Sequence, residues 1–562
     1  MLPNYSTDDN VLPSSLNSTI DDNLESFSIT DFYKDKTIFI TGVTGFIGKV
    51  LLEKILRKCS SVRKIYLLIR PNLSASCHER LNKMLTTSIL FKNHQDKIDL
   101  IQAIDGDITV KDLGISENDR QRLIEEVDVV FHSAASIQFT GVLEKFIKQN
   151  IQGTDSLMRL CQNMKHVQSI VYVSTAYGNC HLNEIKEKIY PVVNDQDVEV
   201  YLKQLIEKYS DHDLCEGHSA LQKRPNPYTL SKAIAEWLIK EKYQSTLPII
   251  VCRPSIVLGS HKEPFPGWCD ALSGVSGSFL LLGLGIGQKF IVDKTKNPDL
   301  IPVDLVVNSL IVCGAYRASS HYSPERNVVH INTSTLNPIS WGKFFQLCIN
   351  FKRHIPSIKQ VRPVSIDFSN NYSTVFEKIC YKFNQIFDHL LFAVIFDMIC
   401  MIMGQKPFML KIIQVFHKTM FELKFFSLRQ WNFEHENMPF IYKLVNEKER
   451  PSFNCDVTKI EWEDFCFGMC KGLRRYLLKD PDTTYEQARR RQNRIYLGFR
   501  LFAVFKYFVF YFLFKKYLLQ TILGITLYSL PLSIIDLVIY SYLIRSVFVA
   551  FISFNKSKSF EY

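Results

Sequence analysis

The sequence lacks the features that identify several classes of protein. Its 14 cysteines lie dispersed along 562 residues without a Cys-x-x-Cys pair, which argues against a disulfide framework or a metal site and favours reduced, intracellular thiols. The N-terminus has neither the basic nor the apolar region of a signal peptide, so we expect the chain to start in the cytosol. Apart from residues 489–494, the basic residues behind the net charge of +11 are scattered, which argues against a nucleic-acid partner.

The length of the chain and its changing composition predict several domains. A chain of 562 residues is too long for one compact core. Residues 1–30 are polar and poor in large apolar groups, so we expect a disordered N-terminal arm. Residues 353–480 contain long aromatic and apolar segments compatible with helices, which predict a separate, mainly helical domain.

Between these two segments, residues 31–352 have the alternating pattern of an α/β domain. Short apolar and β-branched runs alternate there with stretches that are compatible with helices. The runs predicted as strands are residues 37–40, 64–69, 100–104, 127–131, 169–173 and 249–252. This alternation predicts a Rossmann-type, doubly wound parallel sheet with helices on both of its faces.

The stretch Thr-Gly-Val-Thr-Gly-Phe-Ile-Gly directly follows the first predicted strand and leads into a predicted helix. A strand, a glycine turn and a helix form the unit that places helix N-terminal amides against a pyrophosphate. In this interpretation Gly42 permits the turn, Gly45 admits the phosphate and Gly48 lets the helix pack on the sheet. The predicted cofactor contacts in this turn are Thr41, Gly42, Gly45, Phe46, Ile47 and Gly48. The glycine spacing alone is also compatible with a simple tight turn.

The residues that follow the next strands favour NADPH as the cofactor. Arg70 ends the second strand, where an acidic residue would bind the ribose hydroxyls of NAD. A cation there suits a 2′-phosphate, although a solvated strand end is the simpler alternative. Asp107 and Ile108 follow the third strand, where backbone and carboxylate can meet the adenine, and Ala134 and Ala135 follow the fourth. Each is compatible with a structural loop, but their order along the chain predicts a cofactor site.

A second group of residues predicts proton-transfer chemistry. Tyr228 and Lys232 are four residues apart and therefore lie on one face of a helix. The pKa of an unperturbed tyrosine is about 10, and a neighbouring ammonium is expected to lower it by stabilising the phenolate. We predict that Tyr228 exchanges the proton and that Lys232 tunes it and holds the nicotinamide ribose. Thr175 or Ser174, at the end of the fifth strand, would polarise a substrate carbonyl. The Tyr-x-x-x-Lys pair alone occurs on many helices, so its position after the nucleotide motifs is the stronger signal.

These motifs resemble those of the extended short-chain dehydrogenases/reductases, and within that group those of the fatty acyl-CoA reductases. The resemblance covers about residues 31–480. Besides the motifs above, it rests on residues 132–139, 150–154, 184–191, 253–257 and 301–308. Residues 404–407 and 431–433 resemble markers of the C-terminal male-sterility domain of that family. These last two are the more discriminating, because sugar epimerases and steroid dehydrogenases share the nucleotide motifs.

The resemblance implies NADPH-dependent reduction of a long-chain fatty acyl-CoA to a primary fatty alcohol. One hydride would convert the thioester to a hemithioacetal, CoA would leave, and a second NADPH would reduce the bound aldehyde. The resemblance also implies cofactor contacts at Pro254, Ser255 and Ile256. The glycine-rich residues 283–287 follow no clear strand, so we interpret them as a substrate-side loop rather than a second phosphate loop.

The apolar tail, residues 495–554, predicts attachment to a membrane. Residues 518–544 carry one charged residue, Asp536, and exceed the roughly 20 residues that a bilayer-spanning helix needs. Residues 501–514 are shorter and contain a lysine, which predicts a weaker span or an interfacial helix. A buried hairpin of the core is the alternative. The basic cluster at 489–494 predicts a catalytic domain that faces the cytosol from the endoplasmic reticulum or the peroxisome.

Two other functions fit parts of the same pattern. A membrane-associated steroid or sugar-nucleotide oxidoreductase would have the same fold and differ in the substrate that drives NADPH turnover. A cofactor-binding scaffold is a non-enzymatic alternative, but the intact pair of Tyr228 and Lys232 argues against it. The expected partners are a long-chain acyl-CoA and membrane lipid, and a homodimer is compatible with the sequence.

Overall fold

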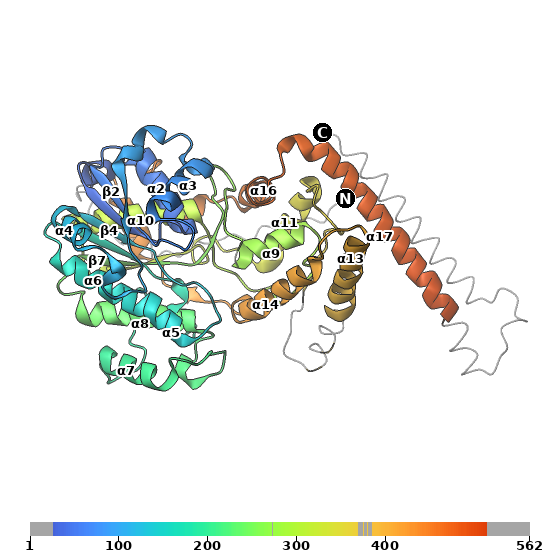
Figure 1. Ribbon diagram of the computed structural model, residues 1–562, viewed down its shortest axis with the longest axis horizontal. Coiled ribbons are helices and arrows are strands. Elements are labelled where there is room, and N and C mark those ends of the chain that lie inside the picture. The colour runs from blue at the N-terminus through green and yellow to red at the C-terminus, as the bar shows by residue number, and fades with distance from the viewer. Residues whose placement is uncertain (1–25, 273, 369–374, 376–378, 380–384, 514–562) are drawn as a thin grey trace, which may run out of the picture. The chain divides into compact units, whose positions relative to one another are not determined.

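The computed structural model describes residues 26–272, 274–368, 375, 379 and 385–513 (Figure 1). The chain forms two compact units, and each is assembled from three separate segments of the chain. The first, which we call the sheet unit, contains residues up to 255 together with 305–331 and 433–456. The second, the helical unit, contains the described residues of 256–304, 332–432 and 457–513.

The sheet unit is built on a seven-stranded parallel sheet with the order β11-β7-β5-β4-β1-β2-β3. The strands are β1 (Thr37–Thr41), β2 (Lys64–Ile69), β3 (Ile101–Asp105), β4 (Val129–His132), β5 (Ser169–Val173), β7 (Ile249–Pro254) and β11 (Val328–Ile331). All six predicted strands are present, with ends shifted by no more than two residues. The sequence did not predict β11, which has only four residues and is separated from its partner β7 by the helical-unit residues 256–304.

Helices cover both faces of this sheet, which confirms the doubly wound arrangement (Figure 1). The helices of the sheet unit are α1 (Ile29–Tyr33), α2 (Phe46–Lys58), α3 (Cys77–Thr87), α4 (Glu117–Glu126), α5 (Leu143–Phe146), α6 (Gly153–Asn163), α7 (Val198–Tyr209), α8 (Pro227–Lys242), α10 (Val303–Ala318) and α15 (Asn437–Lys443). On one face, α4, α6 and α8 share a hydrophobic core with sheet residues such as Phe39 and Val130. On the other, Gly314 of α10 lies close to Phe131 and Val171. Both faces are therefore buried, as a parallel sheet requires.

The helical unit is mainly helical, as predicted for the C-terminal part of the chain. Its helices are α9 (Gly274–Gly283), α11 (Trp341–His354), α13 (Leu391–Ile402), α14 (Met409–Ser427), α16 (Trp462–Gly472) and α17 (Tyr485–Leu513). Short strands pair in parallel, β8 (Ile256–Leu258) with β10 (Leu300–Pro302) and β9 (Lys289–Phe290) with β12 (Asp367–Phe368). The short strands β6 (Glu184–Ile185) and β13 (Asn432–Phe433) complete the described strands. The glycine-rich residues 283–287 end α9 in a close-packed turn, in which Gly285 has φ +74°.

The two units divide the chain differently from the expected boundary at residues 352–353. Residues 256–304 precede that boundary but belong to the helical unit, whereas 433–456 follow it and return to the sheet unit. Phe433 is buried there, with its ring centroid 5.6 Å from those of both Tyr177 and His330. The burial of this aromatic ring explains why a segment from late in the sequence is part of the sheet unit.

The expected N-terminal arm is shorter than residues 1–30, because residues 26–30 contact the segment that follows α15. The backbone N–H of Phe27 donates to the carbonyl of Leu444 at 2.9 Å. The carboxylate of Glu449 accepts the N–H of Ile29 at 2.7 Å and that of Thr30 at 2.9 Å. The first two backbone donors of α1 thus have a carboxylate partner, and Ile29 is fully buried. The prediction for residues 1–25 lies outside the described residues.

The first part of the predicted apolar tail continues α17. Among the helices that the structure describes, none is both long and apolar enough to cross a bilayer. The weaker span expected at 501–514 is therefore not supported, although Leu501 and Phe505 of α17 are exposed. The predicted span at 518–544 lies outside the described residues and stays a prediction.

Candidate active site

The predicted site residues gather where the carboxyl ends of neighbouring strands meet. Strands β2 and β3 lie on one side of β1, and β4, β5, β7 and β11 lie on the other. The chain therefore changes direction across the sheet between β1 and β4. In open α/β sheets, ligands bind in the crevice outside the strand ends at such a point.

The glycine turn after β1 requires glycine at two positions. Gly42 has φ +77°, and a Cβ there would lie 2.6 Å from the backbone N of Ala134. A Cβ at Gly48 would lie 2.3 Å from the carbonyl O of Gly42. Gly45 precedes α2, and no side chain caps this helix. A close-packed turn that leads into an uncapped helix N-terminus is the arrangement that accepts a pyrophosphate. The structure therefore favours a phosphate-binding turn over a simple tight turn at this position.

Thr41 connects β1 with the loop after β4. Its Oγ1 lies 2.7 Å from Nδ1 of His132, whose Nε2 lies 3.0 Å from Oγ1 of Thr154. Burial, with a smaller effect of nearby Lys232, lowers the pKa of His132 to about 3, so the imidazole is neutral near pH 7. The backbone N–H of Ala134 also donates to Thr41 Oγ1 at 3.4 Å. Thr41 thus holds the loop in place, and its direct contact with the cofactor stays a prediction.

Arg70 and Asp107, which follow different strands, lie side by side. Nη1 of Arg70 is 3.5 Å from Oδ2 of Asp107, and the Arg70 side chain is 61% exposed. An exposed pair of this kind contributes little to stability, so the guanidinium stays accessible to a ligand. Arg80 of α3 donates a hydrogen bond to the carbonyl of Arg70 and brings a second guanidinium to this position. The sequence analysis missed Arg80 because it lies ten residues further along the chain.

Other predicted cofactor contacts lie in three places, after β3, after β4 and at the end of β7. Ile108 is buried against the start of α6, where a Cβ at Gly153 would lie 2.3 Å from its side chain. Ala134 and Ala135 are half-buried in the loop beside the glycine turn. Pro254 ends β7 in the sheet unit, whereas Ile256 begins β8 in the helical unit. The structure therefore brings Ala134 to the turn and assigns Ile108 a packing role.

Tyr228 lies in the first turn of α8, where the local sequence fixes the start of the helix. The side chain of Asn226 accepts a first-turn backbone N–H at 2.9 Å, and Pro227 has the fixed φ angle that suits this position. The Tyr228 ring stacks on Phe139, with centroids 6.0 Å apart. The phenol forms a hydrogen bond with Thr175, so two residues predicted from separate motifs meet.

Lys232 lies one turn further along α8 and is buried. Its Nζ donates to the carbonyl O of Val173 at 2.7 Å and lies 4.8 Å from the centre of the Tyr172 ring. Burial lowers the pKa of Lys232 to about 8, while Glu236 acts in the opposite direction. The side chain is therefore mainly an ammonium near pH 7.

The expected lowering of the Tyr228 pKa by Lys232 is wrong in this structure. Burial raises the pKa of Tyr228 to about 12, and the hydrogen bond with Thr175 opposes this rise only in part. The Lys232 ammonium is held by the Val173 carbonyl instead. Tyr228 is thus a neutral phenol near pH 7, which is the protonation state that a proton donor needs.

Two buried hydroxyls at neighbouring strand ends fit a polar ligand. Oγ of Ser174 and Oγ of Ser255 have no hydrogen-bond partner among the described residues. Ser174 follows β5 and Ser255 follows β7, and these strands pair in the sheet. Leaving such a group unsatisfied costs about 1–3 kcal/mol. With the glycine turn, these hydroxyls fit a nicotinamide dinucleotide, whose pyrophosphate would lie at the turn and whose nicotinamide would lie near the two serines.

The sequence analysis missed a buried ion pair behind Lys232. Glu236 of α8 pairs with Arg253 of β7 through two contacts, Nε to Oε1 at 2.9 Å and Nη2 to Oε2 at 2.5 Å. Both side chains are 1% exposed. Arg253 also donates to the carbonyls of Lys186 and Lys188, so the pair connects the helix of Tyr228 with the loop at 184–191. The sequence did hold one hint of this pair. Glu236 lies four residues after Lys232 and therefore on the same face of α8, which points it toward the sheet.

Comparison with known proteins decides the family. Two sequence-family models, both described as "Male sterility protein", match residues 40–310 and 388–480. "Fatty acyl-CoA reductase 1" of Xenopus laevis is 33% identical over 478 residues, which cover 83% of this chain and 90% of the relative. The Homo sapiens protein of the same name is 31% identical with the same coverage. The chain belongs to the fatty acyl-CoA reductase family.

Solved structures agree with the fold of this fatty acyl-CoA reductase family member. The terminal R domain from the myxalamid PKS-NRPS biosynthetic pathway has a TM-score of 0.52 at 18% identity, covering 80% of this chain and 93% of that one. The reductase domain of a non-ribosomal peptide synthetase from Mycobacterium tuberculosis has a TM-score of 0.50 at 17% identity, covering 81% and 94%. Similarity at this identity shows the fold alone. Family membership identifies a reductase with a nicotinamide cofactor.

Proposed function

We propose that this fatty acyl-CoA reductase family member uses NADPH to reduce a long-chain fatty acyl-CoA to a primary fatty alcohol through a bound aldehyde. The observation that carries the proposal is the neutral phenol of Tyr228, hydrogen-bonded to Thr175 one helical turn from the ammonium of Lys232. Relatives that align with 83% of the chain are named for the acyl-CoA substrate. The alcohols would serve as precursors of waxes, ether lipids or other lipids.

Each residue of the site has a defined task in this reaction. A bound NADPH would supply hydride to the carbonyl carbon, and the carbonyl oxygen gains negative charge as the new C–H bond forms. The Tyr228 hydroxyl donates its proton to this oxygen, and Thr175 shares the hydrogen bond. Lys232, which donates to the Val173 carbonyl, would hold the nicotinamide ribose of the bound cofactor. Reduction of the thioester releases CoA, and the resulting aldehyde is reduced in a second round by the same residues.

Turnover by the purified full-length chain tests this function. With hexadecanoyl-CoA as substrate, we expect two NADPH to be oxidised for each hexadecanol formed. One NADPH per released aldehyde would contradict the alcohol-forming reaction. Turnover that requires a steroid or a sugar nucleotide would replace the function with that of another extended reductase.

Arg70 is proposed to select NADPH, because its accessible guanidinium can pair with the 2′-phosphate that NADH lacks. In Arg70→Asp we expect the ratio of kcat/KM for NADPH to that for NADH to fall about tenfold or more, since a hydrogen bond to a charged group contributes roughly 1.5–3 kcal/mol. Steady-state kinetics with both cofactors measures this ratio. Lys83→Asp, an equal charge change at an exposed position of α3, is the control. An unchanged ratio in Arg70→Asp would remove the assignment.

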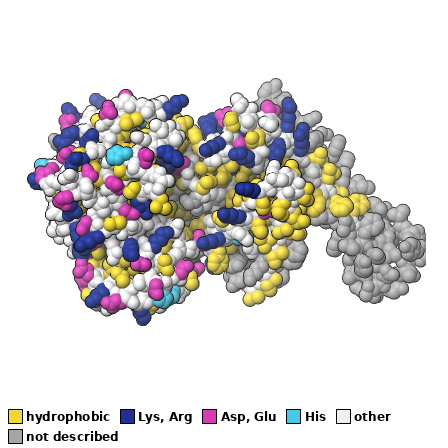
Figure 2. All heavy atoms as spheres, viewed as in Figure 1, with side chains coloured by type: hydrophobic (Ala, Val, Ile, Leu, Met, Phe, Trp, Pro, Cys, Tyr) yellow, Lys and Arg dark blue, Asp and Glu magenta, His cyan; other side chains and the backbone are white. Residues whose placement is uncertain are grey.

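We propose that the protein is attached to an intracellular membrane, the endoplasmic reticulum or the peroxisome, with its catalytic residues facing the cytosol. The apolar sequence at 518–544 supports this proposal. Exposed apolar side chains of α13 add to it, and Ile395, Ile399 and Ile402 are 49%, 51% and 82% exposed. Figure 2 displays hydrophobic side chains gathered on the surface of the helical unit. An apolar surface of this kind needs a lipid or protein partner.

Removal of the tail is expected to release the protein from membranes. Truncation after Leu513 keeps every described residue, including Tyr496, whose hydroxyl bonds to the backbone N–H of Val364 at 3.1 Å. We expect the truncated protein to appear in the soluble fraction after a high-salt wash, whereas the full chain requires detergent. Persistence of the truncated protein in the membrane pellet would assign the attachment to the exposed apolar residues of α13 or α17, and release by Ile399→Glu or by Phe505→Glu would tell which.

A further inference from the structure

Arg224 is a buried cation of the sheet unit that no sequence motif identified. Its side chain is only 2% exposed. Within the described part of the chain, each hydrogen bond of its guanidinium goes to a neutral oxygen atom. Burial lowers the pKa of Arg224 to about 10, which still leaves the guanidinium charged near pH 7. Burying a charge is costly unless its hydrogen bonds are made, so these few contacts hold the side chain in place.

Two of these hydrogen bonds go to the turn that follows Thr175. Nε of Arg224 donates to the carbonyl O of Gly178 at 2.7 Å, and Nη2 donates to Oδ1 of Asn179 at 2.8 Å. Both acceptors belong to the short 3₁₀ helix η6 (Ala176–Asn179), for which Thr175 is the N-cap. The planar guanidinium therefore binds the end of η6 through two nitrogen atoms at once, which fixes its orientation as well as its distance.

The backbone that leads to Arg224 has an unusual conformation. Gln222 has φ +49° and Lys223 has φ +64°, so two successive residues other than glycine lie in the left-handed region. Such conformations persist only where the surrounding structure holds them. Nη1 of Arg224 donates to the carbonyl of Gln222 at 3.4 Å, and its backbone N–H donates to the carbonyl of Leu221 at 2.9 Å. The contacts of Arg224 thus also fix the loop that leads into α8.

Arg224 joins the two segments that carry the candidate proton donor and its hydrogen-bond partner. It lies two residues before Asn226, the N-cap of α8, and four residues before Tyr228. Its acceptor Asn179 lies four residues after Thr175. The hydrogen bond between Tyr228 and Thr175 therefore connects the same two segments that the guanidinium connects. With both links in place, the phenol has a fixed position relative to the end of β5.

We infer that Arg224 is a positioning residue, which holds Thr175 and Tyr228 at the separation that proton transfer needs. The inference rests on the proposed function, because that reaction requires the Tyr228 hydroxyl to point at the substrate oxygen. A misplacement of about 1 Å by a change away from the reacting atoms can lower the rate about 10²-fold. None of the guanidinium hydrogen bonds among the described residues reaches the glycine turn. Arg224 is therefore expected to act on the chemical step and not on NADPH binding.

Replacing the guanidinium tests this role. Arg224→Met keeps an unbranched side chain and removes all the donors. We expect kcat for each NADPH-binding site of the purified full-length chain to fall about tenfold or more, while Kd for NADPH stays within about twofold. Fluorescence titration with NADPH counts the sites, and hexadecanol formed from hexadecanoyl-CoA gives the rate. Arg224→Lys should lie between the two, because one ammonium cannot reproduce the planar fork.

Arg474→Met is the matched control for the loss of a buried arginine. Arg474 is 1% exposed in the helical unit, and its guanidinium donates to the carbonyl of Pro356 at 3.0 Å and to the hydroxyl of Thr484 at 2.6 Å. We expect this variant to lose stability but to keep kcat per site within about twofold. If Arg224→Met likewise loses binding sites and keeps kcat at each remaining site, Arg224 only stabilises the fold and the inference is overturned.

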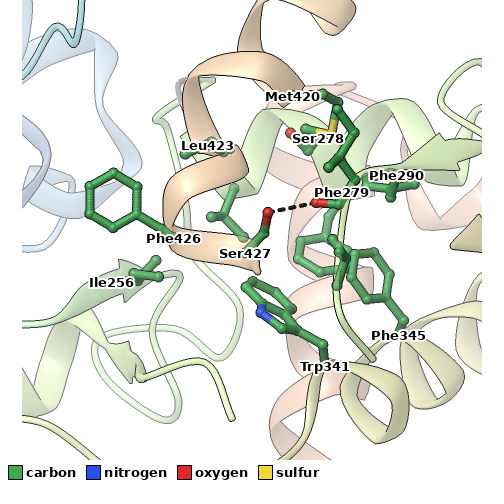
Figure 3. A pocket seen from close by; sticks show the side chains of 13 residues that line it. Ile256, Ser278, Phe279, Phe290, Trp341, Phe345, Met420, Leu423, Phe426 and Ser427 are labelled. Carbon is green, nitrogen blue, oxygen red and sulfur yellow. Dashed lines mark hydrogen bonds between the residues drawn. The ribbon is translucent and has the colours of Figure 1, made fainter. Parts of the chain in front are cut away.

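Asn179→Ala keeps the inference testable if the Arg224 variants do not fold. It removes one acceptor of the guanidinium and leaves the charge in place. We expect kcat per site to fall by less than in Arg224→Met, with Kd for NADPH unchanged. Ser427→Ala, which removes the buried hydrogen bond of Ser427 to the carbonyl of Ile291 at 2.5 Å (Figure 3), is its control. Equal kcat values for Asn179→Ala and Ser427→Ala would count against the inference.

Hydrogen exchange separates failure of this inference from failure of the proposed function. The full-length chain and Arg224→Lys are digested after exchange, and the peptide at 174–180 is compared with that at 37–42. We expect faster exchange at 174–180 alone in the variant. Unchanged exchange there, or faster exchange with unchanged kcat per site, would overturn the inference and leave the function standing. If the unaltered chain forms no alcohol, the proposed function fails, whereas faster exchange at 174–180 would still show that Arg224 positions Thr175.

Discussion

Tyr228→Phe is expected to abolish alcohol formation while leaving the protein folded and able to bind NADPH. The substitution keeps the ring stacked on Phe139 and removes only the hydroxyl that bonds to Thr175. Proton transfer by a positioned side chain typically contributes about 10²- to 10⁴-fold to the rate. We therefore expect kcat to fall by roughly that factor, measured as hexadecanol formed by the purified protein.

The same substitution at the tyrosine that caps the end of α8 provides the control. Tyr243 directly follows the last residue of the helix, as its C-cap, and its hydroxyl donates to Asp155 at 2.6 Å. Tyr243→Phe removes a hydroxyl and one hydrogen bond, which contributes about 1 kcal/mol to stability, but it leaves the active site unchanged. A tyrosine that only packs would tolerate Phe, so near-normal turnover by Tyr228→Phe would remove this residue from the mechanism.

Lys232→Ala is expected to lose both turnover and cofactor binding. Lys232 donates to the carbonyl of Val173, two residues before Thr175, so its loss would disturb the hydroxyl that bonds to Tyr228 and lower kcat. The predicted contact with the nicotinamide ribose is a hydrogen bond from a charged group, which contributes roughly 1.5–3 kcal/mol. We therefore expect Kd for NADPH to rise about tenfold or more, as measured by fluorescence titration.

Lys240→Ala distinguishes these effects from a general loss of positive charge on α8. Lys240 is exposed two turns further along the same helix, so its removal should leave kcat and Kd within about twofold of their original values. If Lys232→Ala binds NADPH normally and loses only kcat, Lys232 acts on the proton alone. If neither quantity changes, its assignment to the site is wrong.

The sheet and the order of the site motifs were predictable because local patterns encode them. Six buried strands have short β-branched runs, and glycine at 42 and 48 is needed where one backbone passes another at close range. β11 was not predictable in this way, since its place in the sheet depends on pairing with β7. The way the two units share the chain was not predictable from local patterns either. It depends on contacts such as those of Phe433 with Tyr177 and His330, which join residues far apart in the sequence.

The geometry of the candidate site was predictable in part. The residue types and their spacing identified Tyr228, Lys232 and Thr175, and two of them share a hydrogen bond in the structure. The direction of the Tyr228 pKa was not predictable, because it depends on burial and on the bond between Lys232 and the Val173 carbonyl. The pair of Glu236 and Arg253 lies on a helix and a strand, so no single stretch of sequence contains it.

The most direct test of the central claim is lipid analysis of cells that express either the unaltered chain or Tyr228→Phe at equal levels. The claim is that this protein makes fatty alcohols and that Tyr228 supplies the proton. We expect new long-chain primary alcohols in the lipid extract of cells with the unaltered chain and none above background in cells with Tyr228→Phe. The absence of new alcohols in both, or their equal abundance in both, would contradict the account.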